Sequence, residues 1–302
     1  MLIALIPVFI VILIGYGLRR AGFPGDEFWP HIEKLTYYVL FPALLFERTV
    51  TVQLDPEIIG PSVIVLITVV LTMSAFIMIV RNWWRAGEPA FTSFFQGSIR
   101  FNTYIGLSAS YALFGEGGLS LAAFIVAIWI PLVNVLCVTV LVVFTGHGVN
   151  RSRTIVLEIV RNPVIVACAG GLLFNATGLD LNKVLLESLS LFGRASLPMG
   201  LMAVGAGLEL ASAHKNIKIV AASCLLKLVL LPLLMLVISS GLGLERTMTL
   251  VAILFASLPG SPLSFILARQ LGGDSRLMAH IVTAQIIVSM MTMPFIMSLV
   301  IR

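Results

Sequence analysis

Long apolar segments recur along the whole chain, with short polar connections between them. Each segment is close to the ~20 residues that an α-helix needs to cross the hydrocarbon core of a bilayer. Charged residues make up only 11% of the sequence, whereas soluble domains contain about 25%, and the mean hydropathy is +1.07. This pattern predicts an all-α polytopic membrane protein.

Ten segments have this character, and no connection between them is long enough to form a soluble domain. We therefore expect every function of the protein to reside in the helical bundle. The expected transmembrane helices, numbered one to ten in chain order, cover residues 2–18, 34–53, 58–80, 89–114, 118–144, 154–175, 185–210, 216–240, 246–271 and 276–300.

Basic residues are concentrated in alternate connections. Because cytoplasmic loops are enriched in Lys and Arg, we expect the odd-numbered connections, which hold eleven of them against three in the even-numbered ones, to be cytoplasmic. Both termini then face outside, in a multi-pass protein of the cell membrane (the inner or plasma membrane). The eleven are Arg19, Arg20, Lys34, Arg81, Arg85, Arg151, Arg153, Lys215, Lys218, Arg269 and Arg276, and the three are Arg48, Lys183 and Arg246. This bias accounts for the net charge of +5, so no nucleic-acid partner is expected.

The two halves of the chain resemble each other in outline. Residues 17–45 and 171–201 each contain a Gly-Leu pair, a polar connection and an apolar helix interrupted by a proline, and the prolines, Pro42 and Pro198, are 156 residues apart. With five expected helices in each half, an odd number, the second half would be inverted relative to the first. A chance match between prolines is the alternative.

The sequence therefore predicts two inverted five-helix repeats, residues 1–146 and 153–302. The same offset of 156 residues relates Thr103, in the fourth expected helix, to Pro259 in the ninth. Polar residues, glycine or proline interrupt the apolar sequence at both places. Irregular backbone survives at membrane depth only inside protein or beside water, so we expect both helices to be broken around a cavity.

The break in the ninth helix has the features of a helix start. Ser261 is suited to the N-cap and Pro262 to the first helical position, while Gly260 permits the chain to turn. In the fourth helix, Asn102 is expected to cap the restart at Thr103. Each restarted helix would direct a positive dipole end and free N–H donors toward the centre of the bundle, which favours an anion. A proline kink that serves packing alone is the alternative.

Four ionisable residues inside the expected helices are functional candidates, because charge is costly at membrane depth. Lys227 is expected to pair either with a substrate carboxylate or with a carbonyl at a helix break. Arg100 is either an anion partner or an internal brace of the break. Arg194 is expected to snorkel toward the membrane surface, and His280 is expected to be a hydrogen-bonded structural residue rather than a proton carrier.

The sequence lacks the motifs of ATP-driven or enzymatic chemistry. It has no Walker A lysine motif, no H-E-x-x-H sequence and no carboxylate pair at membrane depth. The glycine-rich segment 115–118 is expected to be a turn. Cys137, Cys168 and Cys224 lack the paired spacing of a metal or redox site. We therefore expect no enzymatic activity, no bound cofactor and no metal centre.

Six segments follow one another in a characteristic order. They are "KLTYYVLFPALLF", "RFNTYIGLSASYALFGEGG", "RNPVIVACAGGLLF", "SLPMGLMAVGAGLEL", "KLVLLPLL" and "ASLPGSPLSFILARQLGGD". In this order and spacing they resemble the signature segments of the auxin efflux carrier family, in particular its bacterial branch of malonate and malate carriers. The chain is also distantly similar to the bile acid sodium symporters. The resemblance covers almost the whole chain.

This resemblance implies ten helices in two inverted repeats, with the broken fourth and ninth helices crossing at the substrate site. Helices 1, 2, 6 and 7 would form a scaffold, against which helices 3, 4, 5, 8, 9 and 10 move as a transport bundle. A homodimer through the scaffold helices is also implied. Ser108 stands where many relatives have a proline. The residues that match the family's broken helices are Arg100, Asn102, Thr103 and Pro259 to Pro262.

These observations predict a secondary active transporter that carries a small organic anion by alternating access. The substrate would be a carboxylate or dicarboxylate such as malonate or malate, or an auxin-like acid. A membrane protein that senses its ligand, or serves as a scaffold, without net transport is the alternative. Coupling to protons or to sodium stays open, since Ser and Thr oxygens, Asn102 and Gln285 could serve as sodium ligands.

The expected roles at the site are specific. The helix N-termini at Thr103 and Pro262 bind the carboxylate, Asn102 and Ser261 orient it, Gly260 permits its close approach, Pro259 belongs to the same break, and Arg100 or Lys227 balances the charge. The expected partners of the protein are therefore a small organic anion and the lipid bilayer.

Overall fold

The computed structural model describes residues 2–52, 56–81, 86–146, 156–157, 160–208 and 216–301. Every regular element in these ranges is helical, which confirms the predicted all-α class. Six helical stretches within them are long and apolar enough to cross a membrane: Ile3–Arg20, Ile59–Val80, Glu88–Thr145, Lys183–Ala206, Ile217–Gly241 and Ser275–Val300. The protein is thus polytopic, while the expected number of ten spans stays a prediction.

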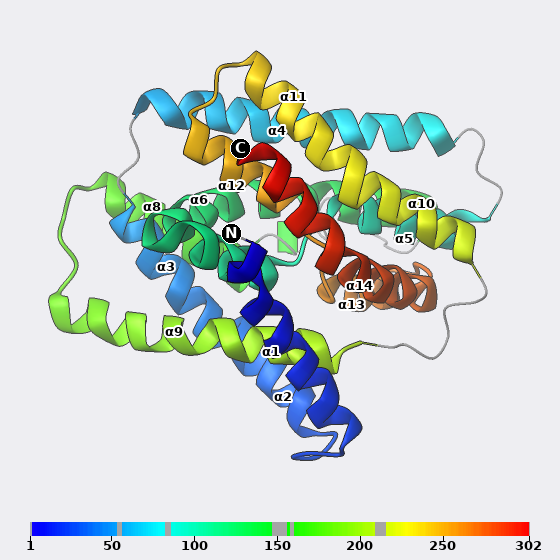
Figure 1. The fold of residues 1–302 in the computed structure, drawn as a ribbon, viewed down its shortest axis with the longest axis horizontal. Helices are drawn as coiled ribbons and strands as arrows, with labels where there is room; N and C mark the ends of the chain where they lie inside the picture. Colours follow the sequence, from blue (N-terminus) through cyan, green and yellow to red (C-terminus); the bar gives the residue numbers. More distant parts are fainter. Residues whose placement is uncertain are drawn as a thin grey trace. The chain divides into compact units, whose positions relative to one another are not determined.

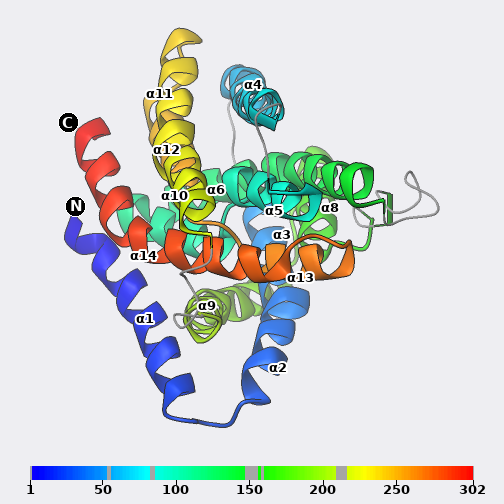
Figure 2. The same cartoon turned by 90° about the vertical axis from the view of Figure 1, so that its right-hand side faces the viewer.

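The helices form two compact units. The first, unit 1, comprises Met1–Leu54, Tyr104–Ala127 and Val160–Leu208. Its elements are α1 (Leu2–Arg20), α2 (Phe28–Leu35), the π-helical segment η1 (Thr36–Leu40), α3 (Phe41–Thr51), part of α6 (Thr103–Thr145), α8 (Pro163–Ala176) and α9 (Lys183–Ala206). The short connection between α1 and α2 reverses the direction of the chain (Figure 2).

Glycines allow α1 and α9 to pack with their backbones in direct contact. A Cβ atom at Gly15 of α1 would overlap the carbonyl oxygen of Met202 in α9, and a Cβ atom at Gly205 would overlap the carbonyl oxygen of Ile12. Small residues permit such close approach between membrane helices, where no hydrophobic effect drives association. The two glycines therefore specify this helix pair.

A proline widens the second expected helix without ending it. α2 continues into η1 and then into α3, which has Pro42 in its first turn. Proline lacks an N–H and its ring crowds the preceding turn, so a π-helical turn makes room for it. α9, by contrast, continues through Pro198. The two prolines that align in the sequence thus differ in their local backbone, and the inverted repeats stay a prediction.

Helix α6 belongs to both units, with residues 104–127 in unit 1 and its remaining residues in unit 2. Gly115 interrupts it with φ 65° and ψ −152°. This left-handed conformation is accessible to glycine at little cost. The expected turn at 115–118 is thus confirmed at its first residue.

The second unit, unit 2, comprises Asp55–Thr103, Ile128–Ile159 and Glu209–Arg302. Figure 1 traces its helices in the colours of the chain order. They are α4 (Pro56–Val80), α5 (Glu88–Ile99), the end of α6, α10 (Ile217–Leu225), the π-helical segment η3 (Leu226–Leu230), α11 (Leu231–Gly241), α12 (Arg246–Ala256), α13 (Leu263–Gln270) and α14 (Ser275–Val300).

Helices α5 and α12 form the buried interior of unit 2. Every residue of α5 from Ala90 to Ile99 is buried, as is every residue of α12 from Val251 to Ala256. α5 contacts α4, α10, α13 and α14, and α11 lies beside α12 (Figures 1 and 2). Polar residues within α5 and at the ends of these two helices are therefore enclosed by protein.

Two expected helix boundaries differ most from the structure. The second helix begins at Phe28 rather than at residue 34, because its first turns contain polar residues and bury only Trp29 and Ile32, and so have a lower hydropathy. The sixth helix, α8, begins at Pro163, where the Asn162 side chain caps it by accepting two backbone N–H bonds. Residues 154–155 and 158–159 of the expected helix lie outside the described ranges.

Candidate functional site

The fourth expected helix is broken between α5 and α6, as predicted. α5 ends at Ile99, Arg100 has extended dihedral angles (φ −73°, ψ 150°), and α6 begins at Thr103. Phe101 and Asn102, the other two residues of the break, are buried. Three residues of irregular backbone thus lie in the interior of unit 2.

The ninth expected helix is broken between α12 and α13, again as predicted. α12 ends at Ala256 and α13 begins at Leu263. The residues from 257 to 261 are all buried. Unit 2 therefore contains two interrupted helices, and each has its irregular backbone shielded from the surroundings.

The expected cap of the restarted helix needs correction. Pro262, and not Ser261, directly precedes the first helical residue. The N–H groups of Ser264 and Phe265 donate to the carbonyl oxygens of Ser261 and Pro262, each at 3.0 Å. The first turn of α13 is therefore satisfied by tight backbone bonds, as is common at helix ends, and the Ser261 hydroxyl does not cap it.

A backbone hydrogen bond joins the two breaks. The N–H of Asn102 donates to the carbonyl oxygen of Pro259 at 2.8 Å. Asn102 has no exposed surface, and Pro259 is also buried. Two segments far apart in sequence, related in the sequence by the offset between Thr103 and Pro259, thus meet inside unit 2.

Gln285 of α14 holds both breaks through its side-chain amide. Its Oε1 accepts the N–H of Gly260 at 2.8 Å, and its Nε2 donates to the carbonyl oxygen of Gly97 at 2.8 Å and to the hydroxyl of Ser223 at 3.1 Å. A Cβ at Gly260 would lie only 2.8 Å from Oε1. The sequence motifs did not reveal this role. Its signal is a glutamine in the middle of an apolar helix.

Lys227 binds the end of the first half of the broken helix. Its side chain has no exposed surface, and Nζ donates to the carbonyl oxygen of Ala256 at 3.2 Å. Ala256 is the last residue of α12, where the helix dipole is negative. The contact corresponds to one of the two expectations for Lys227, a carbonyl at a helix break.

Arg100 contacts the second part of α6. Its Nη2 donates to Oδ1 of Asn134 at 2.7 Å, while Nη1 is buried without a partner. The neighbouring Phe101 packs against Trp129 and Phe255, with ring centroids 5.3 and 5.4 Å apart. These aromatic contacts fix the irregular segment and hold Arg100 beside α6.

The described residues around the two breaks include basic side chains that have no acidic partner. Among the described residues, the ion pairs involve only Arg48 and Arg81 as cations. Lys227 and Arg100 instead bond to neutral oxygens. The breaks therefore carry two cations with no carboxylate partner in the described part of unit 2.

All eight predicted site residues belong to unit 2. The structure brings Asn102 and Pro259 into direct contact, and it attaches Gly260 to Gln285. The N–H donors of Asn102 and Gly260 are consequently occupied by protein acceptors. These two backbone N–H groups are therefore not free in this structure, contrary to the expectation of free donors at the breaks.

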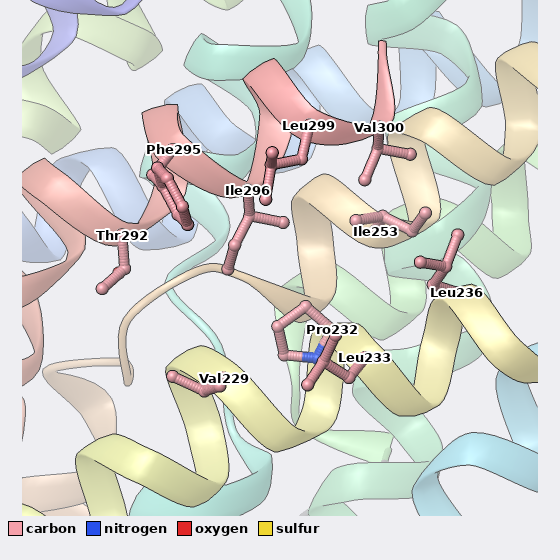
Figure 3. A pocket seen from close by; sticks show the side chains of 10 residues that line it. All are labelled: Val229, Pro232, Leu233, Leu236, Ile253, Thr292, Phe295, Ile296, Leu299 and Val300. Carbon is pink, nitrogen blue, oxygen red and sulfur yellow. The ribbon is translucent and has the colours of Figure 1, made fainter. Parts of the chain in front are cut away.

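An apolar pocket lies elsewhere in unit 2 (Figure 3). It has a volume of about 210 Å³ and is lined by residues of η3, α11, α12 and α14: Val229, Pro232, Leu233, Leu236, Ile253, Thr292, Phe295, Ile296, Leu299 and Val300. The hydroxyl of Thr292 donates within its own helix, to Val288. This hydrocarbon lining offers no donor to a carboxylate, so the pocket is not a candidate for binding an anion.

Comparison with known families shows the family to which the chain belongs. The family described as "Membrane transport protein" matches residues 1–297 of the 302. None of the curated proteins compared with the sequence matches it. The match covers all six segments on which the resemblance was based, together with both helix breaks. The chain therefore belongs to the membrane transport protein family, which is the auxin efflux carrier family.

Proposed function

We propose that the protein is a secondary active transporter of a small organic anion, which binds where the two helix breaks of unit 2 meet. The observation that carries this proposal is the bond between Asn102 and Pro259, with Lys227 and Arg100 attached to the same two breaks. Broken helices with backbone buried beside a polar site are typical of transporters that bind substrate near the bilayer midplane.

The charges favour an anion over a cation. A buried cation is costly unless a counter-charge or hydrogen bonds compensate for it. Lys227 and Arg100 have neutral oxygen partners only, among the described residues. A carboxylate substrate would supply the missing negative charge. Mono- and dicarboxylates, including malonate, malate and auxin-like acids, all have the required group.

The wider architecture of the proposal follows the family resemblance. Ten helices in two inverted repeats would place helices 1, 2, 6 and 7 in a scaffold and the other six in a transport bundle that moves during alternating access. The presence of α1, α2, α3, α8 and α9 in unit 1 is in line with the scaffold, although unit 1 also includes residues 104–127 of α6, which belong to expected helices 4 and 5. A homodimer through the scaffold helices belongs to the same proposal.

The membrane and the orientation are also part of the proposal. We place the protein in the cell membrane, with both termini outside, on the basis of the basic residues in alternate connections. Coupling to a proton, to sodium or to neither ion stays open. The transport experiment is designed to separate these cases.

The test is uptake by purified protein in liposomes, with a panel of labelled mono- and dicarboxylates. An imposed pH gradient and, separately, a sodium gradient should drive at least one acid, and the effective gradient identifies the coupling ion. Empty liposomes and liposomes with heat-denatured protein are the controls. If no acid moves under either gradient while some acids raise the thermal stability, the protein is a sensor or scaffold and the transport proposal is wrong.

A further inference from the structure

Several polar atoms beside the two breaks are buried without a hydrogen-bond partner. Gln96, one turn before Arg100, has no exposed surface, and neither Oε1 nor Nε2 of its amide has a partner. The hydroxyl of Ser264 in α13 is likewise buried and unpartnered, and so is Nη1 of Arg100. Buried polar groups in native proteins are nearly always hydrogen-bonded. Such atoms also occur elsewhere in the described residues, for example in Trp29 and Ser74, so what requires an explanation here is that four of them lie beside the two breaks.

Helices α5 and α13 run antiparallel. At one end, the N–H of Asp274 donates to the carbonyl oxygen of Pro89 at 3.0 Å, just before α14 and at the start of α5. At the other end, the N–H of Asn102 donates to the carbonyl oxygen of Pro259, at the two breaks. These two bonds fix the register of the residues between them.

In this register, Gln96 and Ser264 are level with each other. The position that a Cβ of Gly273 would take is 3.2 Å from both Thr92 Oγ1 and Ala268 Cβ, so Thr92 and Ala268 lie together. Gln96 is four residues beyond Thr92, and Ser264 is four residues before Ala268. Four residues are about one helical turn. Both side chains therefore lie one turn closer to the breaks, on the same faces as this pair.

Arg100 lies in line with Thr92 and Gln96. Thr92, Gln96 and Arg100 follow one another at intervals of four residues, which places them along one side of α5. Leu141 of α6 lies 3.1 Å from the Cβ position at Gly273, and Asn134 of α6 accepts from Arg100. The α6 segment from Asn134 to Leu141 therefore lies alongside the residues from Thr92 to Arg100.

Gln285 provides an internal comparison. Its amide is as deeply buried as that of Gln96, but both of its polar atoms are bonded to Gly260, Gly97 and Ser223. A glutamine with a structural role in this unit therefore has its partners in place. The amide of Gln96 lacks them, which is the state expected of a group that bonds to a ligand.

We propose that Gln96, Ser264 and Arg100 recognise a carboxylate that carries a hydroxyl on the neighbouring carbon, an assignment that rests on the proposed transport function. Nη1 of Arg100 and Nε2 of Gln96 donate to the carboxylate oxygens. Oε1 of Gln96 accepts from the hydroxyl, which a simple carboxylate cannot offer. The Ser264 hydroxyl can donate or accept and completes the set. In the present conformation these atoms are shielded from water, so the ligand reaches them when the helices part during alternating access.

The test compares acids that differ by one hydroxyl. Lactate is paired with propionate, and malate with succinate. Thermal stability of the purified protein is measured against the concentration of each acid, followed by uptake into liposomes. We expect each hydroxy acid to bind about tenfold or more tightly than the matched acid without the hydroxyl. The acid without the hydroxyl would leave the Gln96 amide oxygen without a hydrogen-bond donor.

Variants separate recognition from folding. Gln96→Met has nearly the same shape and removes the unpartnered amide, so its melting temperature without ligand should equal or exceed that of the wild type. It should lose the preference for hydroxy acids, and Ser264→Ala should reduce that preference. The matched control, Gln285→Met, should lower the melting temperature because it breaks existing bonds.

The outcomes distinguish the two proposals. If the wild type responds to acids but does not favour the hydroxy acid of either pair, the role of Gln96 is wrong while the transport proposal stands. The role of Gln96 is equally wrong if Gln96→Met is destabilised as much as Gln285→Met, or if it keeps the preference. If no acid is bound or transported by the wild type, the transport proposal itself fails.

Discussion

The ammonium group of Lys227 donates to the carbonyl oxygen of Ala256 at 3.2 Å, with no exposed surface on the lysine. The bond connects η3 with the last residue of α12, so a positive charge lies at the point where the ninth helix breaks off. The described interior of this unit offers Lys227 no carboxylate, so an anion bound at the break, as proposed above, would supply its counter-charge.

Replacement of Lys227 by methionine tests this relationship. Lys227→Met keeps an unbranched side chain and removes the charge. A hydrogen bond to a charged group contributes about 1.5–3 kcal/mol, and about 1.4 kcal/mol corresponds to a factor of ten, so we expect uptake to fall about tenfold or more. Thermal stability should change less, because removal of a buried charge also removes its desolvation cost.

The control for this variant is Lys34→Met, which changes an exposed lysine of α2. It should leave uptake in liposomes at the wild-type rate. Wild-type uptake by Lys227→Met, at equal amounts of folded protein, would show that the ammonium is dispensable and would restrict Lys227 to a bond within the fold.

The amide of Gln285 is predicted to matter for stability more than any other side chain at the breaks. Gln285→Met leaves the N–H of Gly260 and the carbonyl of Gly97 buried without their partner. Each such group costs about 1–3 kcal/mol, which should lower the melting temperature measured in detergent. Gln270→Met, on an exposed position of α13, is the matched control and should melt like the wild type. Equal melting temperatures for both variants would contradict this role.

The positions of both breaks could be predicted from the sequence, because their signals are local. Proline and glycine side by side in an apolar run, as at Pro259 and Gly260, interrupt the helix, whereas a single proline such as Pro198 stays within a continuous helix. The same reasoning placed the first helical residue at Pro262, one residue too early, because two backbone bonds in the first turn decide that detail.

The partners of the breaks could not be predicted in this way. Gln285 is in contact with Gly97, 188 residues away, and nothing in either segment signals the other. The lack of a hydrogen-bond partner for the Gln96 amide depends on how the helices around α5 pack against it. Such long-range pairings follow from packing, whereas hydropathy and proline patterns describe one segment at a time.

The cap of α12 makes stability depend on pH. Burial alone would raise the pKa of Glu245, but hydrogen bonds from the backbone N–H groups of Thr247 and Met248 lower it below its usual value. A lowered folded-state pKa means that the carboxylate stabilises the fold above its unfolded pKa, about 4.3, and that this contribution is lost as the pH falls through the folded value.

Glu245→Gln should therefore melt below the wild type near neutral pH, and the difference should shrink as the pH is lowered toward about 3. Melting temperature in detergent across this range is the measurement. Glu27→Gln provides the control, since Glu27 precedes α2 without a capping hydrogen bond and is exposed. A constant difference between Glu245→Gln and the wild type at every pH would contradict the charge-dependent cap.

Gly15 and Gly17 of α1 allow a matched test of the contact between α1 and α9 in unit 1. Gly15→Ala places a methyl group onto the carbonyl oxygen of Met202, a backbone atom that can move only if α1 and α9 separate. Gly17, half a turn further along α1, has open space around it. Gly17→Ala should therefore be neutral or stabilising by about 0.5–1 kcal/mol, through the better helix propensity of alanine. Gly15→Ala should lower both the melting temperature and the yield of folded protein. If the two variants behave alike, the backbone contact between α1 and α9 does not hold unit 1 together.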